Sequence, residues 1–292
     1  MTQKVSLAQL IRDEVHSGMT VYLAGFSHLI PFAAGHEIIR QEITHLTLSR
    51  ATPDLLYDQM IAAGCADRLI FSYAGNPGVG LLPAFRRAVE SGQLIIDEFT
   101  HAEMIARLDA GAAHLPFWPL RAEPNDLSRH RGRKTVVCPY THETIAVVPA
   151  LNPDVTLVHA QRADEAGNLY VWGLRGEMKE AALAAQTLIA TVEKVVPAGA
   201  LRHRQENLLV PGFRVKAMAE VPFGAHPSYA QGLYERDTAF YQEWNRIAKD
   251  PESCRRWIKT WIKEVADHQA YLQRWDPEHW ETLKAKGGSL DE

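Results

Sequence analysis

Short apolar runs alternate with helical patterns along the first two thirds of the chain. The first β-like runs begin roughly every 25 residues, about the length of a strand, a helix and two loops: Thr20–Gly25, Leu46–Ser49, Leu69–Tyr73 and Leu94–Asp97. Later runs of the same kind are Thr135–Cys138, Val155–His159 and Thr187–Val192. Because strand–helix alternation is typical of parallel sheets with right-handed crossovers, the pattern predicts an α/β fold. We expect an open, mainly parallel sheet with helices on both faces.

The segments between these runs place apolar residues at helical spacing. Near the start, Leu7, Leu10, Ile11 and Val15 alternate with charged residues, which predicts an amphipathic first helix and argues against a signal peptide. Further helical patterns cover residues 31–39, 55–61, 82–89 and 104–112.

The C-terminal part has a different composition, because five of the seven tryptophans lie there: Trp244, Trp257, Trp261, Trp275 and Trp280. Trp257, Trp261 and Val265 share one helical face. We therefore expect an α/β domain over residues 1–228 and a C-terminal helical extension over residues 229–292. The extension is expected to pack on the main domain or on a partner.

The most informative stretch is the end of the first long apolar run. The strand-like residues up to Ala24 lead directly into Gly25-Phe26-Ser27, and Pro31 opens the next helical pattern. A glycine at this junction lets the backbone turn and lets a ligand approach it, and proline suits a first helical turn. A pocket of backbone amides at the carboxyl end of a strand is one interpretation; an ordinary strand-to-helix turn is the other. Neither nucleotide-binding glycine motif is present.

A second candidate is the acidic end of the run at residues 94–97. A carboxylate such as Glu98, beside apolar residues at the same sheet edge, can act as base, acid or nucleophile. Alternatively, Asp97 and Glu98 cap a helix that starts near Thr100. His101 with Glu103 lacks the spacing of a two-histidine zinc motif, as does His142 with Glu143, so no metal is expected.

Two further polar stretches each have two interpretations. Gln161, Asn168 and Glu177 could orient a substrate or could satisfy loop backbone. A basic segment could be a solvated loop or a clamp for an anionic group such as a CoA phosphate; it contains Arg121, Arg129, Arg131, Arg133 and Lys134.

Composition limits the class of protein. The 292 residues carry a formal net charge of −4, which gives no general attraction for nucleic acid or an anionic membrane. No uninterrupted apolar run is long enough to span a bilayer. The three cysteines are far apart and form no Cys-x-x-Cys pair, so we expect small buried thiols and a cytoplasmic location.

Several stretches together resemble the A chain of family I CoA-transferases, in particular the glutaconate CoA-transferase branch. The chain differs from that family's glycine-rich signature at Ala24 and Leu29, where the family often has glycine. The resemblance extends over most of residues 5–250 and is carried by Ser17-Gly18-Met19-Thr20 through Gly25-Phe26 to Pro31, by Asp97–His101 with Leu115–Pro119, by Val148–Asn168, and by Ala225–Tyr229.

The resemblance implies a CoA-transferase-like fold and a heterodimer or heterotetramer of A and B subunits that moves CoA between carboxylic acids. The attacking glutamate of that family belongs to a Ser-Glu-Asn-Gly-like motif of the B subunit, and this chain has no such motif. The A chain is then expected to bind acyl-CoA, to form an oxyanion loop and to line part of the acyl pocket. The residues that we assign to this site are Gly25, Phe26, Ser27, His28, Tyr73, Gly75, Asn76, His101, Glu103 and Gln161.

Two other functions remain open. The chain is also similar to the A chain of a CoA-transferase-like heteromer that hydrolyses a carbon–carbon bond in a cyclic CoA thioester during steroid-ring degradation. In that case the resemblance implies that Glu98 acts as a general base. Glu98 is important under both the transferase and the hydrolase interpretation, so it is the catalytic residue that we assign. The third possibility is a non-catalytic paralogue that binds acyl-CoA.

Overall fold

The computed structural model describes residues 2–121, 126–127 and 134–285 of the chain. Its centre is a 10-stranded sheet in which the neighbours along the main path are all parallel. The path runs through β1 (Gln3–Lys4), β13 (Val215–Glu220), β11 (Thr187–Val196), β9 (Val155–Asp164), β2 (Thr20–Leu23), β3 (Leu46–Ser49), β4 (Ala66–Phe71) and β5 (Ile95–Glu98). The short strands β10 (Leu169–Tyr170) and β12 (Leu208–Val210) add an antiparallel corner. The predicted open, mainly parallel sheet is confirmed.

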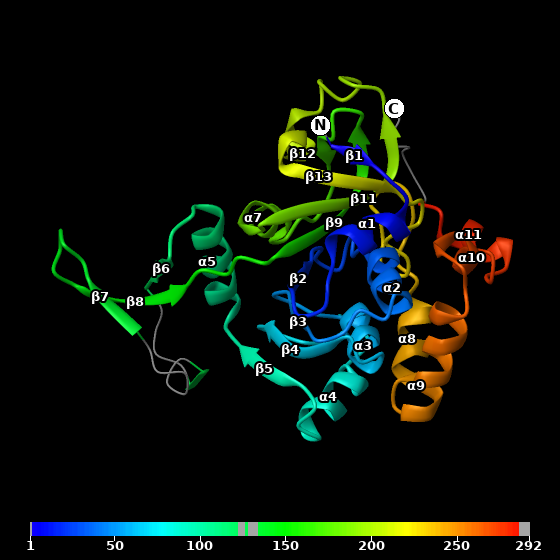
Figure 1. Cartoon of the computed structure of the whole chain (residues 1–292), viewed down its shortest axis with the longest axis horizontal. Helices are drawn as coiled ribbons and strands as arrows, with labels where there is room; N and C mark the ends of the chain where they lie inside the picture. Colours follow the sequence, from blue (N-terminus) through cyan, green and yellow to red (C-terminus); the bar gives the residue numbers. More distant parts are fainter. Residues whose placement is uncertain (1, 122–125, 128–133, 286–292) are drawn as a thin grey trace.

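Helices cover both faces of this sheet (Figure 1). Side chains alternate along each strand, so Val21 and Leu23 enter one apolar cluster while Tyr22 enters the other. The first cluster packs under α1 (Leu7–Glu14), α2 (Phe32–Arg40), α3 (Leu55–Ala62), α4 (Pro83–Glu90), α8 (Thr238–Ile247) and α9 (Pro251–Ile258). The second packs under α5 (His101–Ala112), α7 (Met178–Ala184) and α11 (Pro277–Leu283).

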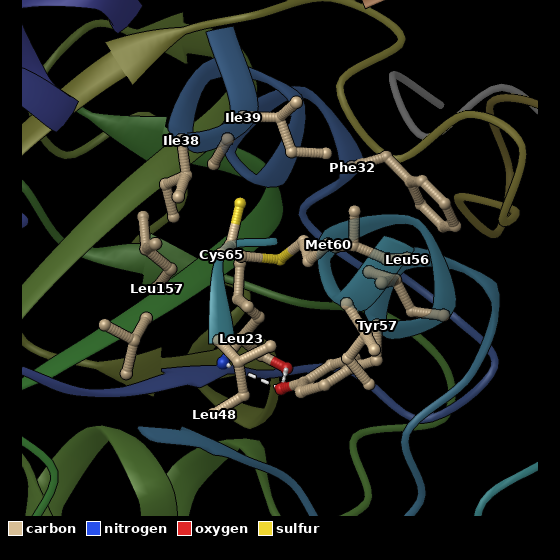
Figure 2. Close-up of a cluster of buried hydrophobic side chains, with 14 of the residues drawn as sticks. Leu23, Phe32, Ile38, Ile39, Leu48, Leu56, Tyr57, Met60, Cys65 and Leu157 are labelled. Carbon is tan, nitrogen blue, oxygen red and sulfur yellow. Dashed lines mark hydrogen bonds between the residues drawn. The ribbon is translucent and has the colours of Figure 1, made fainter. Parts of the chain in front are cut away.

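The first cluster also fixes the spacing of the central strands. Figure 2 shows Tyr57 of α3 reaching Leu23 of β2 among buried aliphatic side chains. The Tyr57 hydroxyl donates to the Ser49 carbonyl at 2.7 Å and accepts from the Leu23 amide at 3.2 Å. One buried phenol therefore ties the carboxyl ends of β2 and β3 together, next to the loops that follow them.

A separate antiparallel sheet lies away from the body of the molecule, at the left of Figure 1. It has the order β6 (Phe117–Leu120), β8 (Thr144–Pro149), β7 (Lys134–Val137). The apolar run at residues 135–138 therefore joins this sheet and not the central one. Pro119 lies on the edge strand, where a missing N–H does least harm. Cys138, at the end of this run, is only half-buried, which corrects the expectation for that thiol; Cys65 and Cys254 are buried.

The C-terminal helices pack on the same chain. After α9 come a π-helical turn at Lys259–Lys263, α10 (His268–Leu272) and α11. Trp244 is fully buried and its indole N–H donates to the Asp58 carboxylate at 3.0 Å, and Trp257 stacks on Trp261. The tryptophan-rich face is therefore used within the chain, while the proposed division at residue 228 stays a prediction. None of the helices in the described ranges is long and apolar enough to cross a membrane.

Candidate functional site

The loops after β2, β3, β4 and β5 all leave the same edge of the sheet, because these strands are parallel. This edge is where open α/β sheets bind ligands. It carries the loop at residues 24–31, Arg50 after β3, the segment at residues 72–80 after β4, and Glu98 at the end of β5. The prediction that Gly25 and Glu98 share one sheet edge follows directly from this topology.

The loop between β2 and α2, which we call the Gly25 loop (residues 24–31), has an unusual backbone. Gly25 has φ of +120°, and Ser27 and Leu29 have φ of 56° and 51°. A Cβ atom on Gly25 would lie 2.7 Å from the His28 carbonyl oxygen and 2.9 Å from that of Leu29. Only glycine fits, because both the dihedral angle and the close carbonyl oxygens exclude a side chain.

Several amides of the Gly25 loop are available as donors. The Phe26 N–H donates to the His28 carbonyl at 3.2 Å, and the Leu29 N–H donates to the Tyr229 carbonyl at 3.0 Å. The N–H groups of Gly25, Ser27 and His28 have no acceptor among the described residues. Because such groups are almost always paired in folded proteins, unpaired amides at a ligand-binding edge are suited to hold a negatively charged oxygen.

His28 is a buried support of this loop. Its Nδ1 lies 2.9 Å from the Leu174 carbonyl, and its Nε2 accepts from the Gln231 amide at 3.0 Å, so the proton is on Nδ1. The ring also packs on Tyr229, with ring centroids 4.7 Å apart. Burial lowers the pKa of His28 to about 4, so the ring is neutral near pH 7. We infer that its side chain positions the loop, while its backbone amide stays available.

The depressed pKa of His28 predicts acid sensitivity. Below pH 6.5 the His28 ring is protonated in the unfolded chain, whereas in the folded chain it is protonated only below about pH 4. Stability should therefore fall over that interval, by about 3 kcal/mol from this group. His28→Phe keeps the ring but removes the titration, so the stability advantage of the parent chain over the variant should shrink from pH 6.5 to pH 4. Urea unfolding at several pH values measures this. Parallel pH profiles for the parent chain and His28→Phe would contradict the assignment of the acid sensitivity to His28.

A second loop, residues 224–229, holds the Gly25 loop in place. The Ser228 hydroxyl accepts from the Ile30 amide at 3.2 Å, and the Gly224 carbonyl accepts from the Ala33 amide at 2.9 Å. Together with Tyr229, these contacts join segments about two hundred residues apart in the sequence. Sequence reasoning gave this loop no role in the site, because no local pattern marks the pairing.

Gln161, Asn168 and Glu177 satisfy other protein groups. The Gln161 carboxamide donates to the Trp172 carbonyl at 2.9 Å and accepts from the Trp172 amide at 3.1 Å. Asn168 hydrogen-bonds to Asp164 at 2.8 Å, and Glu177 accepts from the Tyr22 hydroxyl at 2.8 Å. These contacts agree with the loop-satisfying interpretation. The assignment of Gln161 to the substrate site stays a prediction.

The two acidic residues at the end of β5 make different contacts. Asp97 pairs with Arg68 at 2.7 Å. The cap of α5 is Thr100, whose amide donates to the Glu103 carboxylate at 2.8 Å, so neither Asp97 nor Glu98 is the N-cap. Glu98 is half-buried, and its carboxylate has no hydrogen bond or ion pair with the rest of the described chain. It is the free carboxylate of this strand end.

His101 and Glu103 differ in their exposure to solvent and in their hydrogen bonds. His101 is exposed in the first turn of α5, whereas Glu103 is buried and its carboxylate serves the capping box with Thr100. Their roles toward a substrate stay predictions, and the cap already accounts for the presence of Glu103.

Glu98 and the Gly25 loop are not direct neighbours. Strands β3 and β4 lie between β2 and β5. At about 4.8 Å per strand pair, the two strand axes are about 14 Å apart. Within this chain, the Gly25 amides and the Glu98 carboxylate are therefore suited to contact different parts of one bound ligand.

The segment after β4 lies between these two places. The Tyr73 and Gly75 amides donate to the carbonyls of Ala51 and Pro53 at 3.1 Å each, and the Tyr73 side chain is 53% exposed. A Cβ on Gly75 would lie 2.7 Å from the Tyr73 hydroxyl, so glycine lets this side chain fold back over the backbone. Asn76 is buried, yet neither end of its carboxamide has a hydrogen-bond partner in the described part of the chain. Such a group is costly unless another molecule satisfies it.

Arg50 is a buried charged residue at this edge that sequence reasoning missed. It directly follows β3, is 1% exposed, and its guanidinium pairs with Asp54 at 3.2 Å. Burial by itself lowers the pKa of Arg50, but the charge interactions with Asp54, Tyr57, Glu177 and Tyr22 together raise it. Arg50 is therefore a permanently charged guanidinium that is buried at the carboxyl edge of the sheet and balanced by the Asp54 carboxylate. A charged residue directly after an apolar strand was the signal that could have identified it.

The structure describes only two of the basic residues that were candidates for an anion clamp. Arg121 pairs with Glu143 at 2.6 Å on the surface, and Lys134 begins β7. Arg129, Arg131 and Arg133 lie outside the described residues. The anion clamp therefore stays a prediction.

Comparison with known proteins places this geometry in context. Residues 4–220 match the family model described as coenzyme A transferase. The A chain of the 3-oxoadipate CoA-transferase from Pseudomonas knackmussii is 47% identical over 276 residues, which covers 93% of this chain and 97% of the relative.

Two further relatives are informative. The crystal structure of glutaconate coenzyme A-transferase from Acidaminococcus fermentans superimposes with a TM-score of 0.92 at 28% identity, covering 99% of this chain and 97% of that one. The cholesterol ring-cleaving hydrolase IpdA subunit of Rhodococcus jostii is 29% identical over 291 residues, covering 94% of this chain and 97% of the relative. The similarity thus includes both transferase and hydrolase subunits.

Proposed function

Because this chain belongs to the coenzyme A transferase family, we propose that it is the A half of a heteromeric enzyme that moves CoA between two carboxylic acids. The chain is similar over almost its full length to named A chains of CoA-transferases, which identifies it as a CoA-transferase subunit of the A type. The proposal adds a B-type partner chain, acyl-CoA as substrate, and a division of the chemistry between the two chains.

In the proposed reaction, a glutamate carboxylate from the B chain attacks the thioester carbonyl of the acyl-CoA. Negative charge then develops on the carbonyl oxygen, and the amides of Gly25, Ser27 and His28 donate to it. The intermediate expels the CoA thiolate and leaves a mixed acyl–glutamyl anhydride. The thiolate attacks the glutamyl carbonyl, which releases the first acid and forms a glutamyl-CoA thioester. The same steps in reverse load the acceptor acid.

The observation that carries this proposal is the state of the Gly25 loop. Unpaired amides at the carboxyl end of β2, in a backbone that only glycine permits, form a preorganised oxyanion site. The chain has no Ser-Glu-Asn-Gly-like motif to supply the attacking glutamate. Arg50, paired with Asp54, lies at the same edge. Tyr73, Gly75 and the unsatisfied carboxamide of Asn76 are proposed to line the acyl pocket, where a polar acyl group would satisfy that carboxamide.

The test is to co-express the chain with a B-type subunit encoded beside it and to purify the complex. A panel of CoA esters and free acids, including 3-oxoadipate, is incubated with the complex and followed by mass spectrometry. We expect co-elution from a sizing column and CoA exchange between ester and acid. Separate elution of the two chains, or no exchange with any pair, would overturn the proposal.

A second candidate is a ring-opening acyl-CoA hydrolase, favoured by one observation. The Glu98 carboxylate has no partner among the described residues and lies about 14 Å from the Gly25 loop by strand spacing. A general base at that distance suits a bulky cyclic acyl group whose reacting bond is remote from the thioester. The same mass-spectrometric panel separates the two candidates, since hydrolysis adds water to the substrate whereas transfer produces a new CoA ester.

A further inference from the structure

The described residues contain one group of histidine and carboxylate side chains with the geometry of a metal site, and it lies outside the proposed acyl pocket. His226, Asp237 and His279 each offer a ligand atom, and these atoms all lie within 4.8 Å of one another. His226 and Asp237 are buried, and the side chain of His279 is 22% exposed. No local motif marks them, because they are distant in the sequence.

The distances between these atoms fit a small divalent ion. Nε2 of His226 is 3.1 Å from Oδ2 of Asp237, and Nε2 of His279 is 2.9 Å from the same oxygen. Zn²⁺ bonds of 2.0–2.1 Å in a tetrahedral site place ligand atoms about 3.3 Å apart. Small side-chain shifts would therefore admit an ion between the three atoms.

One of the ring nitrogens is not satisfied by the protein. Although Nε2 of His279 lies 2.9 Å from the Asp237 carboxylate, it makes no hydrogen bond with any described residue. A buried polar atom without a partner is costly. A metal ion would use its lone pair.

The surroundings resemble the second shell of a metal centre. Nδ1 of His226 lies 3.0 Å from the Tyr271 hydroxyl, which would orient the ring when Nε2 binds a metal. The other carboxylate oxygen of Asp237 accepts from the Phe240 amide at 2.9 Å. Trp275 stacks on His279 at 4.4 Å between centroids, and so contributes an apolar wall. Each ligand is thus held by a further group.

We propose that His226, Asp237 and His279 bind a divalent transition-metal ion, with Zn²⁺ as the best match to two imidazoles and one carboxylate. The ligands come from the loop at residues 224–229, the N-cap of α8 and the first turn of α11. A bound ion would therefore fasten the C-terminal helices to the loop that supports the Gly25 loop. This proposal does not depend on the proposed reaction.

Cobalt substitution tests the site directly. The purified chain or complex is stripped with a chelator and titrated with Co²⁺, whose visible absorption reports a tetrahedral site with nitrogen ligands. We expect bands that saturate at one ion per chain and disappear when Zn²⁺ is added. Excess Zn²⁺ should also raise Tm by about 5 °C. The proposal would be overturned if Co²⁺ produced no visible bands and Zn²⁺ left Tm unchanged.

Variants locate the ion. His279→Gln removes a partly exposed ligand from the last helix and should abolish both the bands and the Tm shift; His226→Gln repeats the test from the other imidazole. Asp67→Asn is the matched control, since His45 and Asp67 form a similar contact of 2.8 Å on the surface. An unchanged response in a folded His279→Gln variant, or loss of the response only in Asp67→Asn, would overturn the proposed site.

Discussion

Replacing Gly25 with alanine will lower kcat of the assembled enzyme by roughly 10²- to 10³-fold, the loss typical of a damaged oxyanion site. The new methyl group meets the carbonyl oxygens of His28 and Leu29 at 2.7 and 2.9 Å, and both belong to backbone. The loop must therefore shift, which displaces the unpaired amides. The strain at φ of +120° adds about 1–3 kcal/mol to the loss of stability. Steady-state kinetics of the complex and thermal unfolding measure the two effects.

Gly18→Ala is the control for the backbone effect alone. Gly18 has φ of +89°, but a Cβ there meets nothing within 4 Å. We expect a stability loss of about 1 kcal/mol and unchanged kcat. Full activity in a folded Gly25→Ala complex would show that the loop geometry has no part in the reaction.

For the ring-opening hydrolase candidate, Glu98→Gln is expected to lower kcat of the complex by at least about 10²-fold, the usual contribution of a positioned acid or base. The variant should unfold at nearly the same temperature as the parent, because the carboxylate has no partner among the described residues to lose. Kinetics on the substrate pair identified by the panel provide the measurement. Unchanged activity would remove Glu98 from the chemistry.

The adjacent Asp97 offers a close control for Glu98. It lies on the opposite face of β5, since side chains alternate along a strand, and it already pairs with Arg68 at 2.7 Å. Both partners are more than a third exposed, so Asp97→Asn should cost less than about 1 kcal/mol. Its kcat should match the parent. An equal loss of activity in both variants would indicate a general electrostatic effect and not a specific role for Glu98.

Local sequence patterns were sufficient for most elements of the central sheet. The run at Leu46–Ser49 is the strand β3 without any shift, and that at residues 20–25 gives β2. The helical spacing from Leu7 gives α1, capped by Ser6. Such patterns succeed because the alternation of buried and exposed positions is a property of each element by itself.

The same patterns did not predict the structure where it depends on which other segment a strand or helix packs against. The apolar run at residues 135–138 has ordinary strand character, yet it pairs with β8 in a separate sheet. The helical face around Trp257 could equally have met another protein chain, and the structure shows it packed on Trp244 and Trp261 within this one. Periodicity identifies a face that must be buried, but not what covers it.

The candidate site likewise has features that the local sequence predicts and features that it does not. The turn at Gly25 could be predicted from the residues around it, because a glycine between a strand and a helix has a local meaning. The support from Ser228 and Tyr229, the burial of Arg50 and the grouping of His226 with His279 could not, since these contacts join residues that no short pattern connects. Strand order is likewise a tertiary result: β9 lies beside β2, although more than one hundred residues separate them. The amino-acid order sets each element and its apolar face, and close packing of those faces then decides which distant loops meet at the carboxyl edge.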